Sequence, residues 1–91
     1  MVAHPTNRKP SAEALRIREL LVAHLCKMIR SQDFTQSEAA KWLGVSQPRV
    51  SDLKRRRLDR FTIDSLIGLL TNAGIRVSVE FSELKRSPNR E

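Results

Sequence analysis

Side chains that can form hydrogen bonds with nucleic acid are concentrated near the middle of this 91-residue chain. Gln47, Arg49 and Ser51 lie close together in the sequence, and Arg55 and Arg56 follow shortly after them. A glutamine amide can donate to and accept from adenine, whereas an arginine can pair with guanine or hold a phosphate. These residue types therefore suit contact with duplex DNA, provided that one structural element presents them together.

Two short helices joined by a glycine turn are predicted around these residues. Thr35 and Glu38 have the spacing of a capping box, which places the start of the first helix at Thr35. Gly44 stands where a helix ends in a left-handed residue, Ser46 can cap the second helix, and Pro48 falls in its first turn. The pattern predicts a helix-turn-helix over residues 35–55, whose inward-facing residues include Ala40, Leu43, Val45, Val50 and Leu53.

In such a motif the N-terminal end of the second helix meets base edges in the major groove of DNA. Base contacts supply sequence specificity, whereas contacts with phosphate supply affinity and make binding sensitive to salt. Gln47 is placed to read a base, Arg49 to read guanine or reach a phosphate, and Arg55 to hold a phosphate. The residues predicted from this pattern to bind DNA are Ser46, Gln47, Pro48, Arg49, Ser51, Arg55 and Arg56.

The same stretch carries a family resemblance. Gln36, the run LGVSQPRVS at 43–51 and the run FTID at 61–64 resemble the Cro/repressor (Xre) class, and more closely the HigA-like antitoxins and their small Xre-type relatives. The resemblance covers residues 15–81. It implies a DNA-binding repressor in which Gln36 also belongs to the DNA-binding site, where it holds a phosphate and braces Gln47.

Several functions are compatible with this resemblance. An antitoxin of this type would neutralise a small ribonuclease toxin and repress its own operon. A stand-alone or phage-type Xre regulator would share the DNA-binding motif without having a toxin, and an adaptor that binds only proteins is a further alternative. The sequence contains no metal constellation, phosphate loop or paired carboxylates, so we expect neither an enzyme nor a cofactor.

The chain departs from the family pattern at Arg56, where relatives often have a glycine just after the recognition helix. Glycine adopts the left-handed conformation at little cost. Either the helix ends here without a left-handed residue, or Arg56 adopts that conformation with strain. An additional phosphate contact would compensate for the strain.

Charge and composition agree with a polyanionic partner. Lys and Arg total 17 against 10 Asp and Glu, which gives a net charge of +7 and favours nucleic acid. Cys26 is the only cysteine, so no internal disulfide can form, and its place in an apolar helix predicts a small buried thiol. There is no apolar run of ~20 residues that would span a membrane and no signal-peptide core, so we expect a cytoplasmic protein on the bacterial nucleoid.

Two further helices are expected around the motif, which makes residues 11–74 a mainly α, small helical bundle. One is capped by Ser11 and runs through about Arg30. The other is capped by Thr62 and ends at Gly74. The buried stripe predicted for the first of these helices consists of Leu15, Ile17, Leu20, Leu21, Leu25 and Met28.

Residues 75–82 alternate apolar and polar side chains and predict one β-strand. Because the chain offers no second strand, we expect two copies to pair antiparallel near Ser78 and Val79, with pairing to a toxin as the alternative. Such a homodimer would meet half-sites about 34 Å apart in an inverted-repeat operator. Residues 1–10 are expected to be a disordered tail and 83–91 a flexible one. The dimer would bury Ile75, Val77, Val79 and Phe81 on the last helices.

Overall fold

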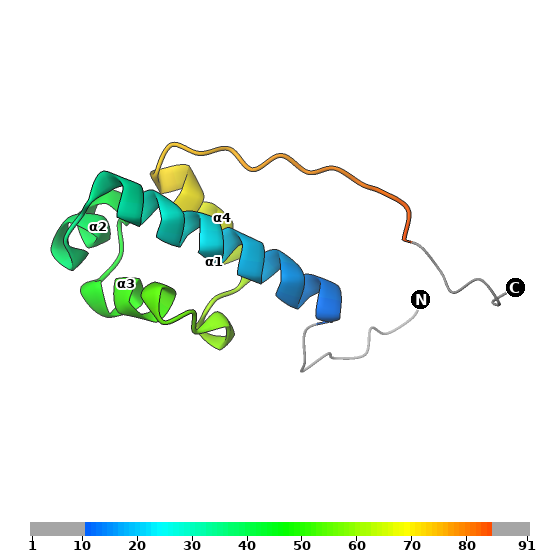
Figure 1. Ribbon diagram of the computed structural model, residues 1–91, viewed down its shortest axis with the longest axis horizontal. Helices are drawn as coiled ribbons and strands as arrows, with labels where there is room; N and C mark the ends of the chain where they lie inside the picture. Colours follow the sequence, from blue (N-terminus) through cyan, green and yellow to red (C-terminus); the bar gives the residue numbers. More distant parts are fainter. Residues whose placement is uncertain (1–10, 85–91) are drawn as a thin grey trace, which may run out of the picture.

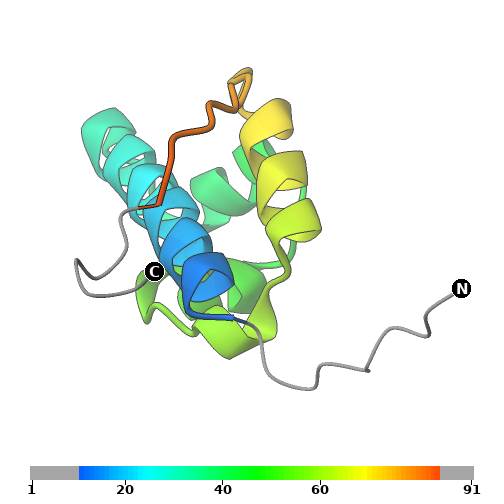
Figure 2. The same cartoon turned by 90° about the vertical axis from the view of Figure 1, so that its right-hand side faces the viewer.

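The computed structural model describes residues 11–84, so the predicted tail at 1–10 and most of the one at 83–91 lie outside it. Within the described range the chain is mainly helical, as predicted. The elements are α1 (Ala12–Gln32), α2 (Gln36–Leu43), α3 (Gln47–Lys54), the 3₁₀ helix η1 (Leu58–Arg60) and α4 (Ile63–Asn72). The long α1 packs against α3, η1 and α4, while α2 packs against α3 and α4 (Figures 1 and 2).

Capping side chains determine where three of the α-helices begin. Ser11 Oγ accepts a hydrogen bond from the third amide of α1 at 3.1 Å. At α2 the Glu38 amide donates to Thr35 Oγ1 and the Thr35 amide donates to Glu38 Oε1, which completes the predicted capping box. Thr62 and Ser65 form the corresponding box at α4. Each cap contributes about 1 kcal/mol to helix stability. The capping residues are close together in the sequence, so the helix starts could be predicted, and the structure confirms them.

The core lies where α1 crosses the other helices. The buried residues of α1 are Val22, Leu25, Cys26 and Ile29, which recur at the i, i+3, i+4, i+7 spacing of one helix face. The complete set of buried residues in the described part of the chain is Val22, Leu25, Cys26, Ile29, Ala39, Ala40, Leu43, Val50, Leu53, Phe61, Leu66, Leu69 and Leu70.

The stripe predicted for the first helix is therefore partly wrong. Leu25 is buried, but Leu15 is 40% exposed and Leu20 is 57% exposed. The reason is that the N-terminal half of α1 extends beyond the helices that cover its other end (Figure 1). Apolar spacing identifies a helix face, but it does not show how much of that face the rest of the chain can cover.

The predicted β-strand is absent from the described residues. Residues 75–84 form an extended segment that runs back along α1, and this segment has no backbone ladder with any other part of residues 11–84 (Figure 1). Ile75 and Val77 are half-buried and pack against the core, whereas Val79 and Phe81 are exposed. A strand requires a partner, and nothing else in the described chain is extended alongside this segment.

Candidate nucleic-acid interface

The turn between α2 and α3 is held by a side chain from α4. Gly44 ends α2 in the predicted left-handed conformation, with φ 72°. Asn72 Nδ2 donates to the Leu43 carbonyl at 2.7 Å and would lie 3.1 Å from a Cβ placed on Gly44. Gly44 therefore meets two requirements, a positive φ and the close approach of Asn72. The angle between the two helices is thus supported from outside the motif.

The N-terminal end of α3 presents exposed polar groups. Ser46 is the N-cap residue, but its hydroxyl forms no capping hydrogen bond in the described structure, unlike the prediction. Pro48 lies in the first turn, where a missing amide leaves no bond unmade. Ser46, Gln47 and Pro48 are all exposed. Exposed amide and hydroxyl groups at a helix N-terminus are free to contact the edges or phosphates of a duplex.

Gln36 and Gln47 are brought together from different helices. Gln36 lies in the first turn of α2, and its Nε2 donates to the backbone carbonyl of Gln47 at 3.3 Å. The contact braces the backbone of α3 at its first residue and leaves the Gln47 side chain exposed. The contact is compatible with the bracing role that the family resemblance implied for Gln36, whereas its contact with a phosphate stays a prediction.

Arg49 is occupied by contacts within the protein. Its guanidinium carbon lies 4.1 Å from the centre of the Phe61 ring, and its Nη1 donates to the Arg60 carbonyl at 2.8 Å. A cation stacked on an aromatic ring gains about 0.5–1 kcal/mol or more when it is partly shielded from water. Arg49 therefore joins α3 to the segment that leads into α4, a role that spacing within α3 could not reveal.

The C-terminal half of α3 carries a smaller polar cluster. Ser51 and Asp52 are half-buried, and Asp52 Oδ2 lies 3.6 Å from Arg60 Nη1. Asp52 is thus paired with a neighbouring arginine, in agreement with its negative charge beside a basic surface. Ser51 lies one turn from Gln47 and is the less accessible of the two.

Arg56 adopts the conformation that a glycine would have. Arg55 ends α3 with φ −85°, and Arg56 follows with φ 58°, in the left-handed region. The Arg56 amide donates to the Leu53 carbonyl and the Arg57 amide to the Asp52 carbonyl, at 2.9 and 3.0 Å. These two bonds close the helix as in a Schellman motif, with arginine in the position where glycine is preferred. The left-handed conformation costs about 1–2 kcal/mol for a residue other than glycine, and it carries an exposed cation here.

A basic surface continues from Arg56 onto α1. A depression of about 290 Å³ is lined by Cys26 and Ile29, together with the cations Arg30, Lys54 and Arg56. None of these three cations has a carboxylate partner within the described residues. The contribution of Arg30 comes from a helix outside the motif, so the sequence pattern of the motif did not identify it.

Cys26 lies behind this basic surface as a buried thiol, as predicted. Its Sγ donates to the Leu53 carbonyl at 3.3 Å. Burial raises the pKa of the Cys26 thiol, although the nearby cations oppose that shift. The thiol is thus protonated at neutral pH and packs as a small apolar group.

The described residues contain neither a metal-binding cluster nor a membrane-spanning helix. No group of three or more His, Cys, Asp or Glu residues between 11 and 84 is arranged to hold a metal ion. No helix in the same range is both long enough and apolar enough to cross a membrane.

Comparisons with known proteins agree with the geometry. The family model for a helix-turn-helix domain matches residues 7–82 of the chain. A solved structure named "Putative XRE Family Transcriptional Regulator" is similar to this chain, with a TM-score of 0.69 and 30% sequence identity over 90% of each chain. No curated protein sequence matches. The similarities cover the whole described bundle rather than the motif alone.

Proposed function

The chain belongs to the Xre-type helix-turn-helix family of DNA-binding transcriptional regulators, and we propose that it acts as a sequence-specific repressor. In this proposal the N-terminal end of α3 enters the major groove, where Gln47 reads a base. Gln36, Ser46, Arg55 and Arg56 contact the phosphates on either side. The protein would act on the nucleoid, in the cytoplasm.

The observation that carries the proposal is the contact between Gln36 and the Gln47 carbonyl. It joins the first turn of α2 to the first turn of α3, so that both helix N-termini are held together on one surface. Backbone amides at helix N-termini bind anions, and an exposed glutamine between them is suited to base recognition. The net charge of +7 supports the same partner.

We further propose that the repressor is a homodimer. The exposed apolar residues after α4, Val79 and Phe81, lie on an extended segment whose backbone does not pair with any other described residue. Two copies joined through this segment would present two α3 helices, and DNA with matching symmetry would be an inverted repeat.

Selection of bound sequences from a pool of random duplexes tests the proposal. The full chain is expected to enrich one inverted repeat and to bind it at physiological salt far more tightly than an unrelated duplex. A control duplex with one half-site scrambled should lose most of that affinity. Equal affinity for every sequence would contradict a sequence-specific repressor and favour the alternative of a protein-interaction adaptor.

An antitoxin role is the finer proposal, and the resemblance to HigA-like antitoxins supports it. Trp42 is half-buried, its ring meets that of Phe34 edge-on at 5.1 Å, and we propose it as a contact with the toxin. Co-expression with the neighbouring open reading frame, followed by pull-down, should recover a complex with a small ribonuclease. A neighbourhood without a toxin gene, together with normal growth after deletion, would support the stand-alone or phage-type regulator.

A further inference from the structure

The extended segment after α4 has a sequence whose chemistry is symmetric about Ser78. With increasing distance from Ser78, an apolar residue is matched by an apolar residue on the other side, and a cation is matched by an anion. The matched pairs are Val77 with Val79, Arg76 with Glu80 and Ile75 with Phe81.

This segment is available for pairing with another chain. Its last backbone hydrogen bond in the described structure is from the Ile75 amide to the Leu70 carbonyl, at 2.8 Å. Beyond that point the backbone forms no hydrogen bond with another residue of the described range, as at the open edge of a sheet. Val79 and Phe81 are 73% and 91% exposed. Among the described residues, the backbone beyond Ile75 therefore has no hydrogen-bond partner, and the side chains of Val79 and Phe81 remain exposed.

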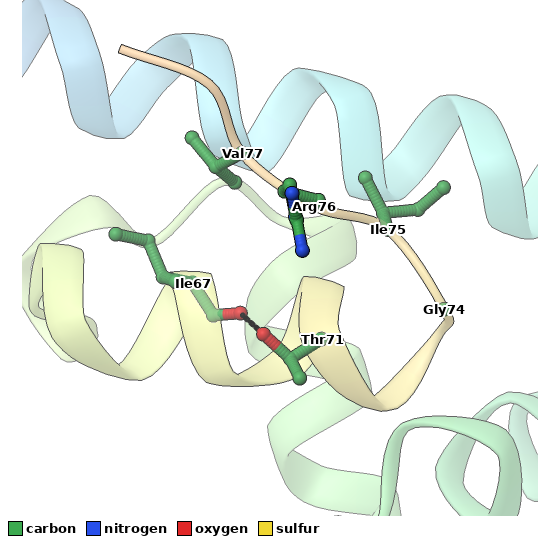
Figure 3. Close-up of a pocket in the computed structure, with 6 residues that line it drawn as sticks. All are labelled: Ile67, Thr71, Gly74, Ile75, Arg76 and Val77. Atoms are coloured by element: carbon green, nitrogen blue, oxygen red, sulfur yellow. Dashed lines mark hydrogen bonds between the residues drawn. The ribbon is translucent and has the colours of Figure 1, made fainter.

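A groove lies beside the first half of the segment. It has a volume of about 390 Å³ and is bounded by α4 and by residues 74–77. Figure 3 shows Ile67 and Thr71 of α4 on one side and residues 75–77 on the other. The Thr71 hydroxyl donates to the Ile67 carbonyl at 2.9 Å, so the polar group on that wall already has a partner. The groove can accept an apolar side chain without leaving this hydroxyl unsatisfied.

We propose that two copies of this chain pair antiparallel through residues 75–81, with the two-fold axis through Ser78, and that the partner's Phe81 covers the groove beside Ile75. This inference rests on the homodimer proposed above and specifies its register and its contacts.

The requirement for a common apolar face restricts the register. Residues directly opposite each other in an antiparallel pair point to the same face. An axis between two residues would put the apolar side chains of the two copies on opposite faces, whereas an axis through one residue puts them on the same face. Axes through Ser78 or Val79 both satisfy this condition, and they place Phe81 opposite Ile75 or Val77, which both line the groove.

The charges select between these two axes. With the axis through Ser78, Arg76 lies opposite the partner's Glu80, and symmetry repeats the pair. With the axis through Val79, Arg76 would face Ser82 instead. Opposite charges in directly facing positions stabilise a two-stranded pair. A contact between identical surfaces must be self-complementary, which is the property that this segment has, so a second copy fits it better than an unrelated protein.

A charge exchange tests the register. Arg76→Glu or Glu80→Arg alone places like charges opposite each other at two symmetric positions, and each is expected to raise the dimer dissociation constant roughly tenfold. The chain that carries both substitutions, or an equimolar mixture of the two single variants, is expected to recover the affinity of the native dimer. Analytical ultracentrifugation in the absence of DNA measures this.

Glu83→Arg is the matched control, because it makes the same change in charge on the same segment outside the paired residues. It is expected to leave the dissociation constant within about a factor of two of the native value. Failure of the double exchange to restore dimerisation would overturn the register, and a native chain that stays monomeric would overturn the pairing. Binding of the monomer to a single half-site at low salt is measured separately, so that failure of the dimer can be distinguished from failure of DNA recognition.

The position of the partner's Phe81 can be tested without any substitution. In a dimer mixed from isotope-labelled and unlabelled chains, intermolecular NOEs are expected between the Phe81 ring and the methyl groups of Ile67 and Ile75. NOEs from the Phe81 ring to α1 alone would show that the ring lies elsewhere and would overturn this part of the proposal.

Discussion

At the scale of single residues, Gln47 combines a fixed backbone with an exposed side chain, because Gln36 holds its carbonyl. Gln47→Ala should weaken operator binding by ~1–3 kcal/mol and relax the preference at one base pair. Competition binding against operators substituted at single positions measures both effects. Arg55→Ala is the comparison, since loss of a phosphate contact should weaken all sequences alike. An unchanged operator preference in the Gln47 variant would remove the residue from base recognition.

Arg49 illustrates a limit of prediction from sequence at this scale. Its position in α3 suits a base or a phosphate, yet its guanidinium stacks on Phe61 and bonds to the Arg60 carbonyl. Phe61 lies twelve residues further along the chain and meets Arg49 in the folded arrangement of the helices. The residue type and helix position were predictable, whereas the partner depends on the tertiary structure.

A stability measurement separates the two roles of Arg49. Arg49→Ala should lower the free energy of unfolding by about 1–2 kcal/mol, because it removes the stacking on Phe61 and the bond to the Arg60 carbonyl. Urea denaturation measures this free energy. Arg55→Ala is the control, because Arg55 is exposed, and it should change the free energy of unfolding by less than about 0.5 kcal/mol. If Arg49→Ala keeps native stability but loses operator preference, Arg49 reads a base rather than bracing the fold.

At the scale of elements, the sequence was most informative where the physical cause is local. Thr35 with Glu38, Gly44 and Thr62 determine helix ends through contacts within a few residues, and all are as predicted. The short helix η1 was not predicted, and neither was its contact with α1, in which Arg18 Nη1 donates to the Leu58 carbonyl at 3.2 Å across 40 sequence positions. Local caps can be recognised in a sequence, whereas contacts between helices require the folded arrangement.

The exit from α3 provides the clearest test at this scale. Arg56→Gly should raise the free energy of unfolding by about 1 kcal/mol, because glycine relieves the left-handed strain. The same change should weaken DNA binding and make the slope of log K against log salt shallower by about 0.9, since one phosphate contact is lost. Thermal denaturation and salt titrations measure the two effects.

Arg57→Gly is the matched control for this exit, because it removes the same charge where φ is −81°. Glycine relieves no strain at that angle, so stability should stay the same or fall. A lower stability in Arg56→Gly than in the native chain would show that the arginine side chain contributes more to the fold than its backbone costs.

At the scale of the whole molecule, α1 (Ala12–Gln32) extends beyond the part that the other helices bury. The bundle buries its C-terminal half and leaves Leu15 and Leu20 exposed, and Leu20 lies beside residues 77–80 of the segment after α4. The alternation in 75–82 predicted a strand with one buried face. The described residues contain no strand, and only Ile75 and Val77 of that face pack against the core. The helices were predicted well from the sequence. Which of their apolar side chains are buried was predicted less well, since burial depends on how all the elements pack and on any partner chain.

A truncation tests the role of this segment in the whole molecule. A chain ending after Ser78 keeps Ile75 and Val77, which pack against the core, and loses Val79 and Phe81, which do not. Its melting temperature should equal that of the native chain, but it should sediment as a monomer. It should also bind the full operator much more weakly than the native chain does, because each half-site alone contributes little. A truncated chain that remains a tight dimer would place the interface on α1.

The bond from Asn72 to the Leu43 carbonyl has a consequence for the operator itself. It fastens the turn before α3 to α4, and only Ala73 and Gly74 separate Asn72 from the segment through which the proposed dimer forms. No long linker lies between the two DNA-reading helices of such a dimer, so their distance and relative rotation are set by the protein. One base pair inserted between the half-sites rotates one of them by roughly a tenth of a turn relative to the other. A rigid dimer could then no longer place both α3 helices in the major groove at their half-sites. The spacer length of the operator should therefore be invariant even where the bases within it vary freely.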